Sequence, residues 1–245
     1  PSSDAGAVVA LAERLELLLS IFAKGERPSG SSDPYALRRA GNGVLLILWD
    51  RCWRLDLRTF LTTAAEEWAG LFPTFAVDSS QLEMDLAQLL RQRIVSQLEE
   101  DGHDPDLVQA VAGEAVAIER LLSDPLDVQD RIRLLKTLRQ NKTLPALLAV
   151  VQRAARLAEK GALAENVLNV SDVVDCTLFA SASEAEMFRV LRELEPLATG
   201  RRYEDLADLL VQATPALEAF FDGDGSVMVM ADDAALRANR LNLLS

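Results

Sequence analysis

Histidine and cysteine are scarce in this sequence. Its 245 residues include one histidine, His103, and two cysteines, Cys52 and Cys176, which lie far apart and outside any C-x-x-C pattern. A structural zinc site takes four such ligands, and a serine nucleophile needs a histidine as its base, so the sequence argues against both kinds of site. Two widely separated cysteines favour a reducing, cytoplasm-like compartment over a disulfide framework.

Long apolar runs and phosphate-binding glycine loops are missing as well. No stretch approaches the ~20 apolar residues that cross a bilayer, and residues 1–4 lack the basic start of a signal peptide. Neither G-x-x-x-x-G-K-[ST] nor G-x-G-x-x-G occurs, and no two acids stand out as a general acid and base. These absences predict a chain without a membrane span and without a catalytic centre of its own.

The abundant residues favour helices. Hydrophobic residues make up 49% of the chain and aromatic residues 5%, with leucine and alanine dominant and β-branched runs short. Leucine and alanine lose little conformational freedom in a helix, so the composition predicts an all-α fold. Ser123–Asp124–Pro125 is the clearest break in the helical pattern. We therefore expect a helical bundle of two subdomains, residues 1–124 and 125–245.

Apolar spacing and capping residues predict the individual helices. Val8 belongs to the apolar stripe of a helix over 7–23, and Met84 to that of a helix over 79–100. Asp33 is the expected N-cap of the helix that follows residues 7–23, with Pro34 as its first residue. Further helices are expected at about 56–72, 105–113, 127–141, 144–160, 183–198, 202–212, 214–222 and after Asp233.

Charge is distributed unevenly along the chain. The formal net charge of −13 argues against a nonspecific nucleic-acid binder. Between Arg131 and Lys160, however, there are eight Lys or Arg residues and one acid, Glu159. Such a basic segment is a candidate electrostatic footprint for phosphates. The alternative is a solvated helical hairpin that binds no ligand.

Helical spacing gathers most of these cations into two rows. The first row has positions i, i+3 and i+7 on one helix face: Arg153, Arg156 and Lys160. The second row steps by three along the preceding helix: Arg133, Lys136, Arg139 and Lys142. If the two helices pair as an antiparallel hairpin, both rows join in one positive surface. The segment contains no aromatic residue, so stacking of single-stranded bases would fall to arginine.

Two separated motifs resemble those of a known family. Residues 25–39, GERPSGSSDPYALRR, are similar to the pattern G-x-x-P-x-G-S-x-D-P-[FY]-A-L-R-R. Residues 220–244, FFDGDGSVMVMADDAALRANRLNLL, resemble FFD-x-V-x-V-x-x-D-D-x-x-x-R-x-N-R-L-x-L-L. Both patterns are typical of the β subunit of bacterial-type glycyl-tRNA synthetase. The resemblance covers essentially the whole chain, which is identified as a C-terminal fragment of a member of that family.

The resemblance implies a division of labour. Residues 1–124 would be the end of the HD-like body, and residues 125–245 an anticodon-binding domain of the DALR type that stops one helical segment short. Glycine activation with ATP and Mg would belong to the catalytic α subunit, separate or fused, so we expect no catalysis and no cofactor in this fragment. The implied partners are glycine tRNA and the α subunit in a hetero-oligomer, with no membrane, in the cytoplasm or a plastid.

Three departures from the family pattern bear on sites. Glu13 and Glu16 stand where the family has Asp, and without the His and His–Asp elements of HD phosphohydrolases they hold no metal. This also argues against an independent phosphohydrolase. The family helix A-x-K-R-V-x-N-I is matched only loosely at 151–157, where Arg153 is retained and Arg156 replaces Asn. The turn DGDGS, residues 222–226, is longer than in the family.

The polar residues of the second motif complete the predicted site. Arg237, Asn239 and Arg240 are candidates for RNA contact, with the alternative that the arginines pair with Asp232, Asp233 or another acid and fix the helix in place. For Arg38 and Arg39 of the first motif, we expect a structural ion pair with Asp33 or Glu13 rather than contact with RNA or the α subunit. The predicted function is recognition of glycine tRNA. The alternative is a helical scaffold that docks the α subunit and does not contact tRNA.

Overall fold

The computed structural model describes residues 1–163, 169–222 and 225–244, apart from the side chain of residue 150. All regular secondary structure in these residues is helical, with twelve α-helices and two 3-10 helices. The only β feature among them is an isolated bridge between Ser29 and Ser32. The predicted all-α fold is confirmed. None of the helices described is long and apolar enough to span a bilayer.

The chain divides into two compact units, Pro1–Lys136 and Thr137–Ser245. The division falls inside helix α7 (Pro125–Gln140), after the break at Ser123–Asp124–Pro125 that marks the start of this helix. The assignment of residues 1–124 and 125–245 to an HD-like body and a DALR-type domain stays a prediction.

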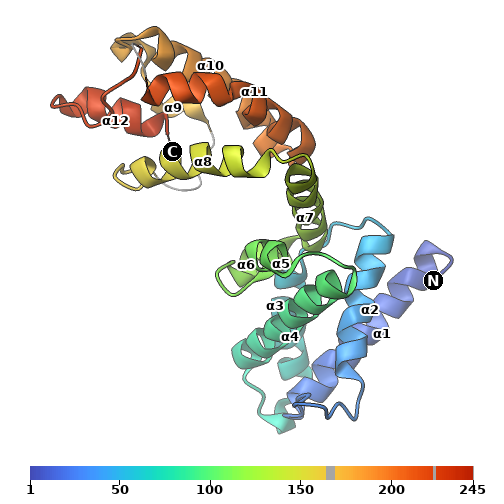
Figure 1. Ribbon diagram of the computed structural model, residues 1–245. Helices are drawn as coiled ribbons and strands as arrows, with labels where there is room; N and C mark the ends of the chain where they lie inside the picture. Colours follow the sequence, from blue (N-terminus) through green and yellow to red (C-terminus); the bar gives the residue numbers. More distant parts are fainter. Residues whose placement is uncertain (164–168, 223–224, 245) are drawn as a thin grey trace. The chain divides into compact units, whose positions relative to one another are not determined.

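The first unit is built on four long helices and their shorter neighbours. Its elements are α1 (Asp4–Ala23), α2 (Leu37–Asp50), α3 (Leu57–Leu71), η1 (Pro73–Phe75), α4 (Ser79–Glu100), α5 (Pro105–Ala112), α6 (Ile118–Ser123) and the start of α7. Helix α2 packs against both α1 and α4, and α3 packs on α4 (Figure 1). Because α4 contacts five of these helices, its apolar face forms the centre of the unit.

Helix α2 begins later than its capping signal predicted. Asp33 accepts hydrogen bonds from the backbone N–H groups of Leu37 (2.7 Å) and Arg38 (3.0 Å), as a capping residue should. The helix nevertheless starts at Leu37 rather than Pro34, because Ala36 adopts the left-handed conformation, with φ of 57°. The Asp33 carboxylate therefore reaches over a turn to the first helical residues.

The apolar stripes of α1 and α4 form the core of the first unit, with two errors in the prediction. Leu18, Leu90 and Ile94 are at most 1% exposed. Val8 and Met84, which we assigned to these stripes, are 55% and 53% exposed. Met84 lies two positions from Leu86 and so on the opposite side of α4. Val8 lies in the second turn of α1, where its side chain reaches the surface.

The second unit packs its helices around the C-terminal motif. Its elements are α8 (Leu144–Ala158), α9 (Val170–Val173), η2 (Cys176–Leu178), α10 (Ala182–Thr199), α11 (Tyr203–Phe221) and α12 (Ala234–Asn242), preceded by the end of α7. Helices α10 and α11 pack side by side, and α8 lies against α11 and α12 (Figure 1). Phe220, Val229 and Leu243 are buried in the resulting core with Met187.

Helix α11 replaces two predicted helices. It runs continuously from Tyr203 to Phe221 with Pro215 inside, whereas the sequence predicted a break between 212 and 214. A proline removes one backbone hydrogen bond from a helix. It is tolerated where the carbonyl groups of the preceding turn find another donor or face solvent. Here Pro215 is exposed, and the hydroxyl of Thr214 donates to the carbonyl of Leu210 at 3.1 Å.

Replacing Leu90 should test the packing of the first unit. Leu90 is fully buried in α4, so we expect Leu90→Ala to lower the free energy of unfolding by about 2–5 kcal/mol. The three tryptophans, Trp49, Trp53 and Trp68, all lie in this unit, so urea unfolding followed by their fluorescence reports on it. Leu71→Ala, at a position that is 74% exposed, is the matched control and should cost less than about 0.5 kcal/mol. Equal effects of the two changes would contradict the assigned core.

Candidate nucleic-acid interface

Helix α8 presents its basic row on the face away from the core. Ala154, Leu157 and Ala158 pack against the core of the second unit, while Arg153 and Arg156 are exposed. The helix ends at Ala158, two residues before the predicted end, and the backbone N–H of Lys160 donates to the Leu157 carbonyl at 3.0 Å. This last bond keeps Lys160 close to the helical path, exposed beside the row.

Arg153 is held by the start of the C-terminal motif. Its guanidinium lies over the ring of Phe221, 4.5 Å from the ring centroid, and makes two hydrogen bonds to the Asp222 carboxylate, one of them 3.0 Å long from Nη2 to Oδ1. The hydrogen bonds from Arg153 hold the pKa of Asp222 below its ordinary value, and those to Asp222 raise the pKa of Arg153. The charge of Arg153 is therefore already balanced at the surface.

Arg156 and Lys160 have no such partner. Both side chains are exposed, and neither makes a hydrogen bond or ion pair with any residue in the described part of the chain. Lys160 also lines a pocket of about 450 Å³, together with Arg237 and Asn242 of α12 and with Leu163 and Leu241. Two predicted cations from distant parts of the sequence are thus brought to one pocket.

Arg237 is partly committed to the fold. Its Nη1 donates to the backbone carbonyl of Ala231 at 2.8 Å, which fixes the guanidinium over the start of α12. Asp233 does not pair with it, because its carboxylate caps α12 by accepting from the Leu236 backbone N–H at 2.8 Å. Arg237 lines the pocket together with Lys160.

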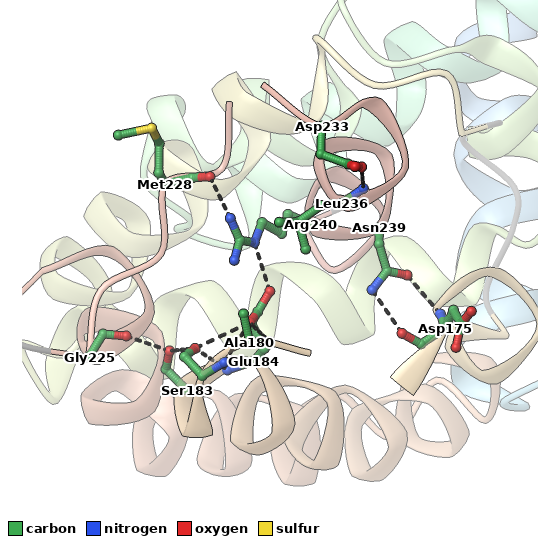
Figure 2. A network of polar contacts seen from close by, with 11 residues as sticks. Asp175, Ala180, Ser183, Glu184, Gly225, Met228, Asp233, Leu236, Asn239 and Arg240 are labelled. Atoms are coloured by element: carbon green, nitrogen blue, oxygen red, sulfur yellow. Dashed lines mark hydrogen bonds and ion pairs between the residues drawn. The ribbon is translucent and has the colours of Figure 1, made fainter. Parts of the chain in front are cut away.

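Arg240 lies inside the unit rather than on a binding surface. It is 7% exposed, its Nε donates to Oε1 of Glu184 at 2.7 Å, and its Nη1 donates to the Met228 carbonyl at 3.0 Å (Figure 2). Glu184 is fully buried and also accepts from the backbone N–H groups of Ala180 (2.7 Å) and Ser181 (2.9 Å). The predicted structural ion pair is therefore made, with Glu184 rather than Asp232 or Asp233.

Asn239 is likewise used in packing. It is 4% exposed, and its side-chain amide bridges the backbone of Asp175: Oδ1 accepts from the N–H at 2.7 Å, and Nδ2 donates to the carbonyl at 3.0 Å (Figure 2). Because this side chain is buried and both its oxygen and its nitrogen already bond to the backbone, it is not presented to a base edge. Asn239 and Arg240 fix the end of the chain to the loop before η2 and to α10.

The residues of the second predicted row, on α7 and in the turn after it, differ in their partners and in the unit to which they belong. Arg133 donates from Nη2 to Gln129 Oε1 at 2.8 Å, and its Nη1 lies 3.7 Å from Asp130. Lys142 is exposed in the turn after α7, with φ of 60°. Arg133 and Lys136 belong to the first unit, whereas Arg139 and Lys142 belong to the second. The continuous positive surface over both rows stays a prediction.

Sequence reasoning missed the acids that position these arginines. Asp222 belongs to the FFD triplet, which from sequence indicates only the resemblance to the family. Glu184 had a local signal, because Ser181 and Glu184 form the S-x-x-E pattern of a capping box, which the structure contains at the start of α10. The pairing of Glu184 with Arg240, 56 positions away, had no such signal in the sequence. Among the described residues, no three His, Cys, Asp or Glu side chains are grouped to hold a metal ion.

Comparisons with known proteins agree on one family. The family model described as glycyl-tRNA synthetase beta subunit matches residues 1–113. Proteins named glycine–tRNA ligase beta subunit align with the whole chain: 42% identical over 250 positions in Picosynechococcus sp., 43% over 249 in Acaryochloris marina and 32% over 251 in Aliivibrio salmonicida. The chain covers 34%, 35% and 33% of these proteins, so it spans about a third of the length of the curated relatives it matches.

Removing the carboxylate of Glu184 should loosen the second unit in a pH-dependent way. Glu184→Gln leaves the buried Arg240 without its counter-charge, so we expect a loss of about 3–5 kcal/mol at neutral pH. Burial alone raises the pKa of Glu184, but Arg240 and the N–H groups of Ala180 and Ser181 outweigh it and hold the pKa below the ordinary 4.5. The carboxylate therefore stabilises the fold above pH 4.5, and this contribution is lost as the pH falls through the lower folded pKa.

Hydrogen exchange of peptides from α10 and α12 measures this effect locally. Exchange in Glu184→Gln should be much faster than in the unchanged chain at pH 7, and the difference should shrink in acid. Glu186→Gln on the same helix is the control, because Glu186 forms a solvent-exposed pair with Arg189, and exposed pairs contribute little to stability. A Glu184→Gln protein as protected as the control would contradict the role of this ion pair.

Proposed function

We propose, since the chain belongs to the glycyl-tRNA synthetase β-subunit family, that it binds glycine tRNA for the ligase reaction. In that reaction glycine is activated with ATP and joined to the tRNA, with ATP and Mg bound by the catalytic α subunit. This chain contributes tRNA binding and no reacting group. Its binding face is the exposed basic end of α8 together with the neighbouring start of α12.

One observation carries this proposal. Arg156 and Lys160 are exposed cations without a carboxylate partner in the residues described, and Lys160 shares its pocket with Arg237. Two other exposed arginines of this unit are neutralised by acids: Arg189 lies between Glu186 and Glu193, and Arg202 bonds to Asp205 at 2.7 Å. In a chain with a net charge of −13, unpaired cations close together at one helix end favour phosphate binding at that place.

The chemistry of this face fits single-stranded RNA. A lysine ammonium binds phosphate as a point charge, whereas an arginine fork can also stack on a base. The pocket beside Lys160 and Arg237 has apolar walls from Leu163 and Leu241, against which a ribose or a base edge can lie. The segment 131–160 has no aromatic residue of its own, but Phe221 of α11 brings a ring beneath Arg153. A planar surface therefore lies next to the unpaired charges.

Neutralising the unpaired cations should weaken tRNA binding. We expect Arg156→Gln combined with Lys160→Gln to lower the affinity for glycine tRNA at least tenfold. The slope of log affinity against log salt should fall by about 1.4, since each of the two phosphate contacts to a single strand contributes about 0.7. Filter-binding titrations at several salt concentrations, with an anticodon-swapped tRNA in parallel, measure both quantities.

A matched double variant controls for the change in net charge. Arg189→Gln with Arg202→Gln removes two exposed arginines that are already paired with acids, so the affinity should change less than threefold. Arg153→Gln should also have a smaller effect than Arg156→Gln, because Asp222 already balances Arg153. An unchanged affinity of the Arg156 and Lys160 double variant would refute this binding face.

A separate observation favours the second candidate function, docking of the α subunit, for the first unit. Leu71, Phe72 and Phe75 are 74%, 44% and 48% exposed at the end of α3 and in η1. The ring centroids of Phe72 and Phe75 lie 4.7 and 5.4 Å from the ring centroid of Trp68, so these three side chains form one aromatic cluster. Exposed apolar clusters of this kind mark protein interfaces.

Polar substitution of this cluster should weaken assembly with the α subunit. Phe72→Ser with Phe75→Ser should lower the affinity for the α subunit about tenfold or more in sedimentation experiments and leave the affinity for tRNA unchanged. Val9→Ser, at a 69% exposed position on α1, is the control. Normal assembly of the double serine variant would exclude the patch as the docking site.

A further inference from the structure

Two arginines of the first unit meet on one face of α2. Arg93 of α4 crosses α2 at Gly41, where a Cβ atom would lie 2.9 Å from Arg93 Cγ. Arg38 lies one turn before Gly41, and residues three positions apart share a helix face. The absence of a side chain at Gly41 therefore lets Arg93 pack closely on the face of α2 that carries Arg38.

Neither arginine has a carboxylate partner within the described residues. Asp33 is engaged by the backbone N–H groups at the start of α2, and Glu13 lies 3.3 Å from Arg14. The predicted ion pair of Arg38 with Asp33 or Glu13 is thus wrong. Arg93 makes one side-chain hydrogen bond, from Nη2 to Ser96 Oγ at 3.2 Å.

Buried polar atoms around the pair are also left without partners. Arg93 Nε is buried and makes no hydrogen bond, and neither does Oδ1 of Asn42, which lies one turn after Arg38. Burial, and after it the charge of Arg38, lower the pKa of Arg93, while Glu100 and Asp33 act more weakly in the opposite direction. The positive charge of the cluster is thus only partly compensated, and an anion would stabilise it.

We propose that Arg38 and Arg93 form a binding site for a phosphate group of RNA, with Asn42 at its edge. A carboxylate is satisfied by a single guanidinium fork, because its two oxygens lie in one plane. A phosphate presents oxygens in a tetrahedral arrangement and can accept from two forks at once. Naming RNA as the source of the phosphate rests on the function proposed above, whereas the anion site itself rests on the arginine pair alone.

Titration with inorganic phosphate tests the anion site on the 245-residue chain. The NMR signal of the Arg93 Nε–H group should shift and saturate with phosphate at constant ionic strength. Arg38→Gln should weaken this binding at least tenfold, whereas Arg39→Gln, at the exposed neighbouring position, should leave it unchanged. Arg38→Lys, which keeps the charge but loses the fork, should bind with intermediate affinity.

Two results would overturn the anion site. One is a shift that does not saturate, or that Arg39→Gln reduces as much as Arg38→Gln does. The other is equal competition by acetate, which would point to a carboxylate of a protein partner. The thermal unfolding midpoint of Arg38→Gln should equal or exceed that of the unchanged chain, because the change removes a like charge beside Arg93. Loss of phosphate binding therefore does not reflect unfolding.

Binding of glycine tRNA tests the source of the phosphate. Arg38→Gln should lower tRNA affinity about fivefold and reduce the salt slope by about 0.7–0.9, the contribution of one phosphate contact. If Arg38→Gln leaves tRNA affinity unchanged while the Arg156 and Lys160 double variant lowers it, this inference fails and the proposed function stands. If neither variant changes tRNA affinity, both fail.

Discussion

The second unit depends on one buried ion pair, between Glu184 of α10 and Arg240 of α12. The carboxylate of Glu184 closes the N-terminus of α10, and the Arg240 guanidinium also binds the Met228 carbonyl, so a single contact joins three segments (Figure 2). Either charge alone would be costly to bury. A buried pair of this kind therefore adds little to the net stability of the unit, and its main effect is to enforce one arrangement of the segments that it joins. It places α12 against α8, and that contact brings Arg237 to the pocket of Lys160.

Arginines serve different purposes in this chain, and their surroundings distinguish them. Arg240 is buried and paired, and it organises the fold. Arg153 is exposed but balanced by Asp222 and the ring of Phe221. Arg156 is exposed and unpaired among the residues the structure describes. Because a paired guanidinium has little to gain from a phosphate, an acidic chain can limit RNA binding to the few cations whose charge is left unbalanced.

Local features of this fold could be predicted from sequence, and long-range pairings could not. Leucine spacing and the caps at Asp33 and Asp233 predicted the helices, since these signals act within a few residues. Periodicity assigned Met84 to the wrong face and could not show that Pro215 lies inside a helix. The bond of Asn239 to the Asp175 backbone joins residues 64 positions apart, and spacing along one helix carries no information about such a partner.

The motif that identifies the family and the residues proposed to bind RNA are different parts of the chain. Asn239 and Arg240 of the C-terminal motif are buried, and their side chains are engaged in contacts within the unit. The unpaired cations Arg156 and Lys160 lie at the end of α8, where the family pattern is matched only loosely. Binding at that place therefore depends on charge and exposure rather than on one residue type, since phosphate contacts carry no sequence information. On the proposed function, selection of glycine tRNA requires contacts to base edges or to the shape of the RNA, and the pocket lined by residues 160–163 and by α12 is the part of this face with walls that could provide them.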